Sequence, residues 1–395
     1  MKKYYPYLIT VSHMINDSCQ SVLPALLLLF IYTYGLSLEQ AGFLILANTA
    51  LSSLLQPLLG YLSDKINQPR LIALGVLLSA CSTGVMGFVT SYESLLVCAT
   101  LAGVGSSIFH PEGAKIMNRL GGGKKGKAMG TFAIGGSSGF AIGPLFAGSI
   151  AYTVGPHGLA AFTVVGLIIS TILFILMPRI VAHARTIDQA VATENPTLVA
   201  KPLKNYWKYF GILFIIILSQ SVNFRVINAF IPIFWTRELG TSPEQGSFAL
   251  TVFFSIGIFM TYIGGLLGDK YGPIKIIRLS LLIWLPAMFL LTEVPTFSSV
   301  IMMPVAYLLL LMIGAAKAIS YSPVIVLGQT YLAKSIGFAS GIPLGVSQTI
   351  GGIIAPVVGN LADTYTLPVA MMTLVPFLVV GLGASLILKD PKKLQ

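Results

Sequence analysis

The sequence has 395 residues, of which 55% are apolar and only 9% are charged, and its formal net charge is +11. Soluble globular proteins carry about 25% charged residues, so this chain cannot cover a soluble body of its size and lipid must surround most of it. A nucleic-acid binder of this charge gathers its cations in dense patches, whereas long stretches of this chain carry none. The composition excludes a soluble enzyme, a disordered chain and a secreted disulfide scaffold.

Apolar stretches long enough to cross a bilayer recur along the whole chain, and we predict an all-α integral membrane protein with twelve transmembrane helices. The two lysines near the N-terminus precede a first span with no early small-residue cleavage site, which predicts an uncleaved helix. The predicted spans are 7–33, 41–61, 71–90, 94–117, 128–152, 158–177, 208–234, 247–267, 274–292, 299–325, 338–361 and 367–388.

A polar, charged segment at 179–206 divides the spans into an N-terminal six-helix half (1–178) and a C-terminal six-helix half (207–395). Among the lysines and arginines, only Arg237 falls in an odd-numbered loop, and only Arg225 and Lys317 fall away from the ends of a span; a few others lie within the terminal residues of a span next to an even-numbered loop. The remaining ones lie in even-numbered loops or near the termini. The positive-inside rule therefore predicts that both termini are cytoplasmic.

The two halves share sequence features. GYLSDK at 60–65 reappears as GLLGDK at 265–270, each just after an even-numbered span. Gly139 and Gly143-Pro144 are matched at a constant offset by Gly351 and Ala355-Pro356. Such internal repeats are typical of transporters whose pseudo-symmetric halves rock around a site near the bilayer midplane.

The loop after the second span contains Gly60, Asp64, Lys65 and Arg70. This segment resembles the loop signature of the major facilitator superfamily, which implies that fold and a gating or structural role for these residues. Asp269 and Lys270 occupy the corresponding loop of the second half. Physically, the glycine lets helix ends approach, and the aspartate can meet a helix N-terminus or a basic partner.

The fifth predicted span has small residues at regular spacing that resemble the motif of proton-coupled exporters within the superfamily. Small residues allow two helices to pack backbone against backbone, and a proline bends the helix. Ala147 replaces one glycine of the family pattern. The residues that match are Gly130, Gly139, Gly143, Pro144 and Gly148.

Three longer blocks, SHMINDSCQS at 12–21, SSLLQPLLGYLSDK at 52–65 and GVGSSIFHPEGAK at 103–115, resemble the fosmidomycin resistance exporters, bacterial proteins that expel a phosphonate antibiotic. The resemblance implies a multi-pass transporter of the bacterial cytoplasmic membrane, driven by inward proton flow, and not an enzyme. It also implies a monomer. We expect no cofactor besides the proton gradient, no metal and no nucleic-acid partner; the partners are a small-molecule substrate, protons and membrane lipid.

Ionisable residues within spans are functional candidates, because each costs roughly 2.5–3.5 kcal/mol to insert. His13, Asp17 and Gln20 lie at i, i+4 and i+7 and therefore share one helix stripe. The equivalent positions in the seventh span are Ser221, Arg225 and Asn228. We expect both stripes to face a shared central cavity.

Asp17 is our first candidate for proton coupling, with its protonation linked to Arg225. A nearby cation favours the charged carboxylate and burial favours the neutral acid, so alternating access can switch Asp17 between the two. The alternative is a permanent structural ion pair, or an Asp17 that is hydrogen-bonded within its own half. His13 shares the stripe, and it is either part of this site or an ordinary hydrogen-bonded helix residue.

His110 and Glu112 flank Pro111 in the fourth span and are candidates for a second proton site. Alternatively, they cap the proline kink or extend toward the basic cytoplasmic loop. Lys317, near the middle of the tenth span, either binds an anion, pairs with an acid or extends toward the cytoplasm. The predicted substrate-binding residues are Arg225, Lys317, Gln20, Asn16, Gln220, Asn223 and Asn228.

Protonation of Asp17 and Glu112 would leave Arg225 and Lys317 as net positive charge, which favours an anionic substrate such as a phosphonate. We therefore predict a proton-coupled exporter of a small anionic organic compound or drug. No nucleotide-binding loop is present, which excludes an ATP-driven pump in this chain. Three alternatives remain: a proton-coupled organic anion importer, a lipid or glycolipid flippase, and a membrane sensor, which the short loops disfavour.

Overall fold

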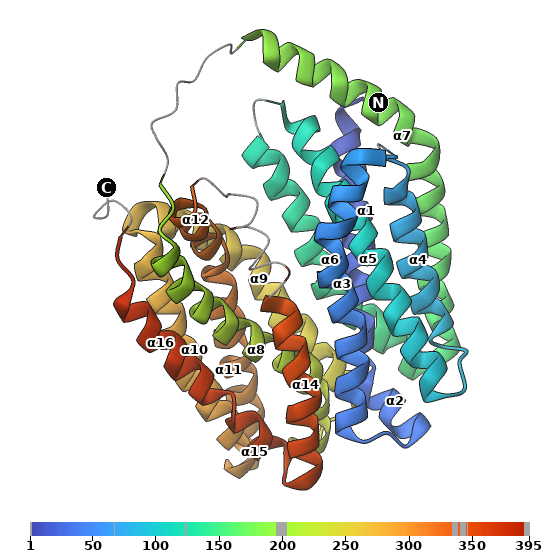
Figure 1. Cartoon of the computed structure of the whole chain (residues 1–395). Coiled ribbons are helices and arrows are strands. Elements are labelled where there is room, and N and C mark those ends of the chain that lie inside the picture. Colours follow the sequence, from blue (N-terminus) through green and yellow to red (C-terminus); the bar gives the residue numbers. More distant parts are fainter. Residues whose placement is uncertain are drawn as a thin grey trace. The chain divides into compact units, whose positions relative to one another are not determined.

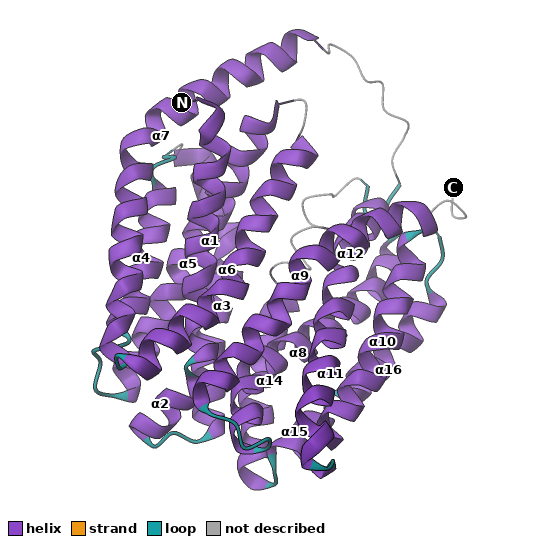
Figure 2. Ribbon diagram, turned by 180° about the vertical axis from the view of Figure 1, so that it is seen from behind, coloured by secondary structure: helices purple, strands orange, loops and turns teal. Residues whose placement is uncertain are grey.

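The computed structural model describes residues 2–66, 68–122, 125–194, 204–333, 339, 345 and 347–390, and these are almost entirely helical. Within these residues the only β-pairing is an isolated bridge between Asn205 and Leu332. Figure 2 accordingly shows helices joined by short loops, with no strand among the parts drawn in colour. This agrees with the all-α membrane fold predicted from the sequence.

The chain divides into two compact units, 1–23 with 47–201 and 24–46 with 202–395. Segment 24–46 therefore groups with the C-terminal part of the chain. The helices in chain order (Figure 1) are α1 (Tyr5–Ala25), α2 (Leu27–Tyr34), α3 (Leu38–Ile66), α4 (Leu71–Val85), α5 (Tyr92–Gly121), α6 (Lys125–Thr153), α7 (Ala160–Glu194), α8 (Trp207–Arg237), α9 (Pro243–Tyr271), α10 (Pro273–Glu293), α11 (Ser299–Ile319), α12 (Tyr321–Tyr331), α14 (Ser347–Thr364), α15 (Leu367–Met372) and α16 (Val375–Ile387).

Within the described residues, nine helical segments are long and apolar enough to cross a membrane, or ten if the bent pair α1 and α2 forms one span. The predicted spans 71–90 and 338–361 correspond to α4 and α14, which are not among them. α4 has 15 residues, and α14 is rich in small and polar residues. The structure thus supports the predicted multi-pass architecture, with fewer spans meeting this criterion than the twelve predicted.

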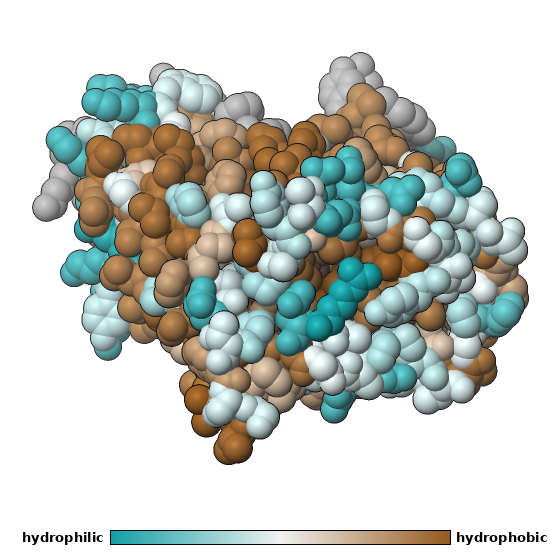
Figure 3. Space-filling view, turned by 90° about the horizontal axis from the view of Figure 1, so that it is seen from below, coloured by the Kyte–Doolittle hydropathy of each residue, from teal (hydrophilic) through white to brown (hydrophobic). Residues whose placement is uncertain are grey.

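The surface of the chain is apolar where helix flanks are exposed. Large apolar side chains such as Ile168 and Phe259 are 56% and 65% exposed. Figure 3 shows brown apolar side chains together with patches of teal and white polar side chains on the face that it views. Exposed apolar flanks are the surface that lipid requires.

In the first unit, a cluster of buried apolar residues joins α1, α4, α5, α6 and α7. Ile9, Val76 and Phe109 are completely buried in this cluster. Glycines allow the closest approaches: a Cβ added at Gly75 would lie 2.8 Å from the backbone of Phe109. The core thereby brings α1, α4 and α5 together around their polar stripes.

The second unit is organised around α8, which packs against α9, α14 and α16. The start of α9 in this unit is well defined by its sequence. The side chains of Ser242 and Gln245 each bond to the backbone of the other residue, and Pro243 occupies the first turn. Phe230, Phe234 and Trp235 are completely buried. This packing places the middle of α8, with its polar residues, inside the unit.

Candidate functional site

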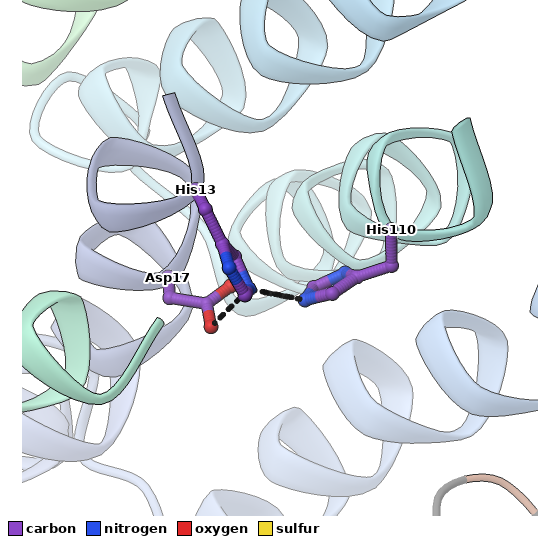
Figure 4. A group of neighbouring side chains, drawn as sticks. All are labelled: His13, Asp17 and His110. Atoms are coloured by element: carbon purple, nitrogen blue, oxygen red, sulfur yellow. Dashed lines mark hydrogen bonds and ion pairs between the residues drawn. The ribbon is translucent and has the colours of Figure 1, made fainter. Parts of the chain in front are cut away.

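His13, Asp17 and His110 form a compact group in the first unit, in which His13 and Asp17 are buried and His110 is partly buried (Figure 4). The Nε2 atom of His13 lies 3.2 Å from Oδ2 of Asp17, and Nε2 of His110 lies 3.2 Å from Oδ1 of the same carboxylate. The two Nε2 atoms are 3.3 Å apart. Asp17 is therefore held between two imidazoles, one from its own helix α1 and one from α5.

The other ring nitrogen of each histidine contacts a backbone carbonyl. Nδ1 of His13 lies 2.7 Å from the carbonyl oxygen of Phe132, and Nδ1 of His110 lies 2.9 Å from that of Ser106. A carbonyl oxygen can only accept, so we assign a proton to Nδ1 in both rings. A neutral imidazole then has a bare lone pair at Nε2, facing Asp17.

This tautomer assignment has a chemical consequence. A bare Nε2 and a carboxylate oxygen are both acceptors and repel each other at hydrogen-bond distance. Each contact with Asp17 therefore needs a proton on the imidazole or on the acid. The three groups titrate as one coupled set, and each proton gained or lost changes the net charge of the set.

The same three side chains offer donor atoms within 4.8 Å of one another, a set of the type that divalent metals use. In the structure these donors contact each other directly. The donor set is thus chemically suited to hold protons or a divalent cation.

Neighbouring residues hold the group in place. Phe132 stacks on His13 with ring centres 3.9 Å apart, and Asn16 donates from Nδ2 to Oδ1 of Asp17 at 3.0 Å. A Cβ at Gly136 would lie 2.7 Å from both Asp17 Oδ2 and His13 Nε2, so only glycine leaves room there. His13 and Asp17 are only 7% and 4% exposed.

The remaining polar residues predicted in the first half have other surroundings. Gln20 donates from Nε2 to Ser79 Oγ at 3.1 Å and to the Ala102 carbonyl at 3.0 Å, which ties α1 to α4 and α5. Glu112 is buried, with Oε1 4.0 Å from Nζ of Lys115. Neither belongs to the group of three.

The second unit contains two cations beside one aromatic ring. Nζ of Lys317 lies 4.2 Å from the ring centre of Phe224, and Cζ of Arg225 lies 5.6 Å from it. No carboxylate of the described residues lies within ion-pair distance of either cation. Their like charges repel each other, and an anion between them would offset this repulsion.

Several predicted substrate residues of α8 have buried polar atoms without a hydrogen-bond partner among the described residues. These atoms are Nε2 of Gln220, Nε of Arg225, Oδ1 of Asn223 and Oδ1 of Asn228. The amide of Asn223 also donates to the Leu374 carbonyl at 3.2 Å, so this side chain contributes to packing near α16. Unpaired buried polar atoms are costly; an anion can accept hydrogen bonds from the donors of Gln220 and Arg225, whereas the two asparagine oxygens need a donor.

The predicted repeat has a counterpart in the packing. In the first unit, a Cβ at Gly139 of α6 would lie 3.0 Å from Cβ of Asp17. In the second unit, a Cβ at Gly351 of α14 would lie 3.1 Å from Cγ of Arg225. Gly139 and Gly351 occupy corresponding positions of the repeat, and so do Asp17 and Arg225. Each glycine packs against the charged residue of its own unit. Asp17 and Arg225 belong to different units, and their coupling stays a prediction.

The predicted motif residues are distributed over both units. Gly143 packs closely against Ser18 and Ser21 of α1, Gly148 is buried, and a Cβ at Gly130 would meet nothing within 4 Å. Pro144 lies inside α6, and Asp269 and Lys270 are exposed at the end of α9. Arg70 stacks over Phe174 at 4.9 Å. Gly60, Asp64 and Lys65 lie in the last turns of α3 and not in a loop, and the side chains of Asp64 and Lys65 are outside the described residues.

Sequence reasoning missed four residues that shape these sites. Ser106 precedes His110 by four residues, a spacing that places both on one helix face and provides a usable signal. Gly136, Phe132 and Phe224 carry no local signal, because glycine and phenylalanine are common in any apolar span. Only the packing of α6 on α1, and of α8 in its unit, reveals their roles.

Comparison with known proteins agrees with this architecture. The family model described as Major Facilitator Superfamily matches residues 7–218 and again 213–395. The chain is 30% identical over 393 residues to the "Uncharacterized MFS-type transporter YfnC" of Bacillus subtilis, covering 98% of this chain and 94% of that protein. It is also 30% identical over 357 residues to the "Fosmidomycin resistance protein" of Escherichia coli, covering 90% and 85%.

Solved structures show the same fold at low sequence identity. A bacterial homologue of the human lysosomal transporter Spinster, in an inward-facing and occupied conformation, has a TM-score of 0.77 and 17% identity, covering 98% of this chain and 96% of that one. A D-xylose-proton symporter has a TM-score of 0.75 and 16% identity, with the same coverage. The family matches over both halves, the 30% identity across almost the whole chain and the shared helical fold show that this chain is a transporter of the Major Facilitator Superfamily.

Proposed function

We propose that this transporter exports a small anionic organic compound, such as a phosphonate, from the cytoplasm in exchange for protons. The observation that carries the proposal is the pair of partly buried cations, Arg225 and Lys317, beside Phe224 and without a carboxylate among the described residues near them. A site with two uncompensated positive charges favours an anion over a neutral compound or a lipophilic cation.

The anion-binding residues offer directional contacts as well as charge. Arginine presents several N–H donors in a planar fork that suits phosphonate and carboxylate oxygens, and lysine adds a point charge. Gln220 has a buried Nε2 without a partner, and it lies on the same face of α8 as Phe224. These groups would together satisfy two or three oxygens of one anionic headgroup.

Proton coupling is assigned to His13, Asp17 and His110. Because both Nδ1 atoms donate to carbonyls, every change of protonation occurs at the Nε2 atoms and the carboxylate. Loading the group with protons from outside and unloading it inside would change its charge during the transport cycle. Asp17 and Arg225 remain the predicted link between proton binding and substrate binding, and Glu112 remains a candidate for a second proton site.

The names of two groups of relatives support export of a drug-like compound. One relative is named for fosmidomycin resistance, at 30% identity. Two Bacillus subtilis relatives are named multidrug resistance proteins, each at 21% identity. Resistance to a drug is commonly achieved by removing it from the cell, and the small-residue motif of α6 is consistent with the exporter type.

The proposal is tested in inside-out membrane vesicles of a bacterial host, in which the predicted cytoplasmic face points outward. After acidification of the vesicle lumen, we expect the vesicles to accumulate a radiolabelled phosphonate, and dissipation of the pH gradient should release it. Vesicles with the Arg225→Gln and Lys317→Gln double variant should accumulate none above the background. Proteins are quantified in the membrane so that loss of transport is separated from loss of protein.

A matched set of compounds separates the alternatives. A cationic and a neutral compound of similar size should not accumulate in the inside-out vesicles. Accumulation of the anion only in right-side-out vesicles with an acidic exterior would identify an importer. Movement of a fluorescent phospholipid between leaflets, without accumulation of any soluble anion, would identify a flippase and overturn the export proposal.

A further inference from the structure

We propose that a basic pocket on the flank of the first unit binds the phosphate headgroup of an anionic phospholipid. The pocket has a volume of about 330 Å³ and is lined on one side by Gln68, Pro69 and Arg70, and on the other by Pro178, Ala182 and Arg185. It is separate from the proton and anion sites, and the proposal does not depend on the direction or substrate of transport.

Two helices place the arginines around this pocket. Arg70 ends the turn that leads into α4, and Arg185 lies on α7, which packs along α4. Pro178, Ala182 and Arg185 are spaced at i, i+4 and i+7, so they share one face of α7. Figures 1 and 2 show α7 on the outer side of this unit, where lipid can reach it.

Both guanidinium groups are available for a ligand. Arg70 stacks on Phe174, with Cζ 4.9 Å from the ring centre, and this stacking orients the fork without using its hydrogen-bond donors. No carboxylate of the described residues lies within ion-pair distance of Arg70 or Arg185. Two arginines with free forks match the oxygens of a phosphate diester, and Gln68 adds an amide donor.

The neighbouring surface indicates a lipid rather than free phosphate. α7 is the least buried of the membrane-spanning candidates, with 22% of its apolar window inside the protein. Val164, Ile168 and Ile175 are 55%, 56% and 62% exposed on this helix, and Phe174, 53% exposed, lies one turn before Pro178. An apolar face that ends at two arginines provides both an acyl-chain surface and a headgroup site for one molecule.

The test uses the full-length protein purified in a mild detergent and analysed by native mass spectrometry. Phosphatidylglycerol and phosphatidylcholine with identical acyl chains are added separately, and the fraction of protein that keeps one lipid is measured. We expect retention of phosphatidylglycerol over phosphatidylcholine. Arg70→Gln and Arg185→Gln should each weaken phosphatidylglycerol binding about fivefold, and the double variant about 25-fold, since one basic residue contributes roughly 1 kcal/mol to binding an anionic lipid.

Arg179→Gln is the matched control, because Arg179 is exposed on the same helix but does not line the pocket. It should leave phosphatidylglycerol retention unchanged. Equal retention by the wild type and the double variant, or an equal loss in Arg179→Gln, would overturn the proposal. Complete displacement of the lipid by excess inorganic phosphate would overturn the lipid assignment. Circular dichroism and the thermal transition establish that each variant is folded. If the double variant does not fold, the two single variants provide the test.

Discussion

The Nε2 atoms of His13 and His110 lie 3.3 Å apart, although the two residues are separated by almost a hundred positions in the chain. Each atom also contacts one oxygen of Asp17 at 3.2 Å. Both imidazoles donate from Nδ1 to the backbone, so their Nε2 atoms can contact the Asp17 carboxylate at this distance only if a proton lies on Nε2 or on the carboxylate. This relationship makes the first unit the proton-binding part of the proposed transport cycle.

The first prediction concerns Asp17. Asp17→Asn keeps the size and one acceptor oxygen but cannot take up a proton, so we expect proton-driven accumulation of the anion to fall at least tenfold. Exchange of labelled for unlabelled substrate without a gradient should continue, because it needs no net proton movement. Both are measured in the same vesicles. Full proton-driven transport by Asp17→Asn would show that this residue has only a structural role.

The second prediction uses two glycines of α6. A Cβ at Gly136 would lie 2.7 Å from Asp17 Oδ2 and His13 Nε2, whereas one at Gly130 would meet nothing within 4 Å. Gly136→Ala should therefore displace the protonation site and reduce transport strongly. Gly130→Ala should keep near wild-type transport, and it controls for a general effect of alanine on the helix. Equal activity of the two variants would contradict the packing described at Gly136.

The third prediction concerns the cations of the second unit. Hydrogen bonds to charged groups contribute about 1.5–3 kcal/mol, so Arg225→Gln or Lys317→Gln should weaken anion binding roughly tenfold or more. Binding is measured by isothermal titration of the purified protein with a phosphonate. Lys275→Gln, an exposed lysine at the start of α10, should bind the anion like the wild type. Unchanged affinity in both site variants would place the substrate elsewhere.

The fourth prediction concerns a helix cap inside the second unit. The two carboxylate oxygens of Asp363 accept hydrogen bonds from the backbone N–H groups of Leu38 and Glu39, each at 2.9 Å, at the start of α3. Asp363→Ala should lower the free energy of unfolding by about 0.5–2 kcal/mol, the usual effect of removing such a cap. Thermal unfolding in detergent measures it.

Thr364→Ala is the control for this cap, because among the described residues the Thr364 hydroxyl bonds only to the Asn360 carbonyl of its own helix, at 2.9 Å. It should change stability less than Asp363→Ala does. The stability of Asp363→Asn should lie between those of Thr364→Ala and Asp363→Ala, since asparagine keeps one acceptor oxygen. A stability of Asp363→Ala equal to that of the wild type would show that the cap contributes nothing measurable.

The sequence by itself determined the class of protein and most of the charged candidates. Low charge, long apolar spans and the motif around Gly60 indicated the superfamily, because a bilayer restricts spanning structures to a few forms with strong compositional signals. The i, i+4 spacing of His13 and Asp17 also placed them on one face of a helix. The repeat in the sequence pairs Gly139 with Gly351.

Only the tertiary structure decided which candidates meet. Gln20 lies on the same stripe as Asp17 but bonds to α4 and α5, while His110, from a distant span, contacts the Asp17 carboxylate. Contacts between helices depend on crossing positions and on close approaches at residues such as Gly136, and helical periodicity carries no information about either. The sequence could therefore identify the ionisable residues within the spans. Only the packing of α1, α5 and α6 brings the side chains of His13, Asp17 and His110 together.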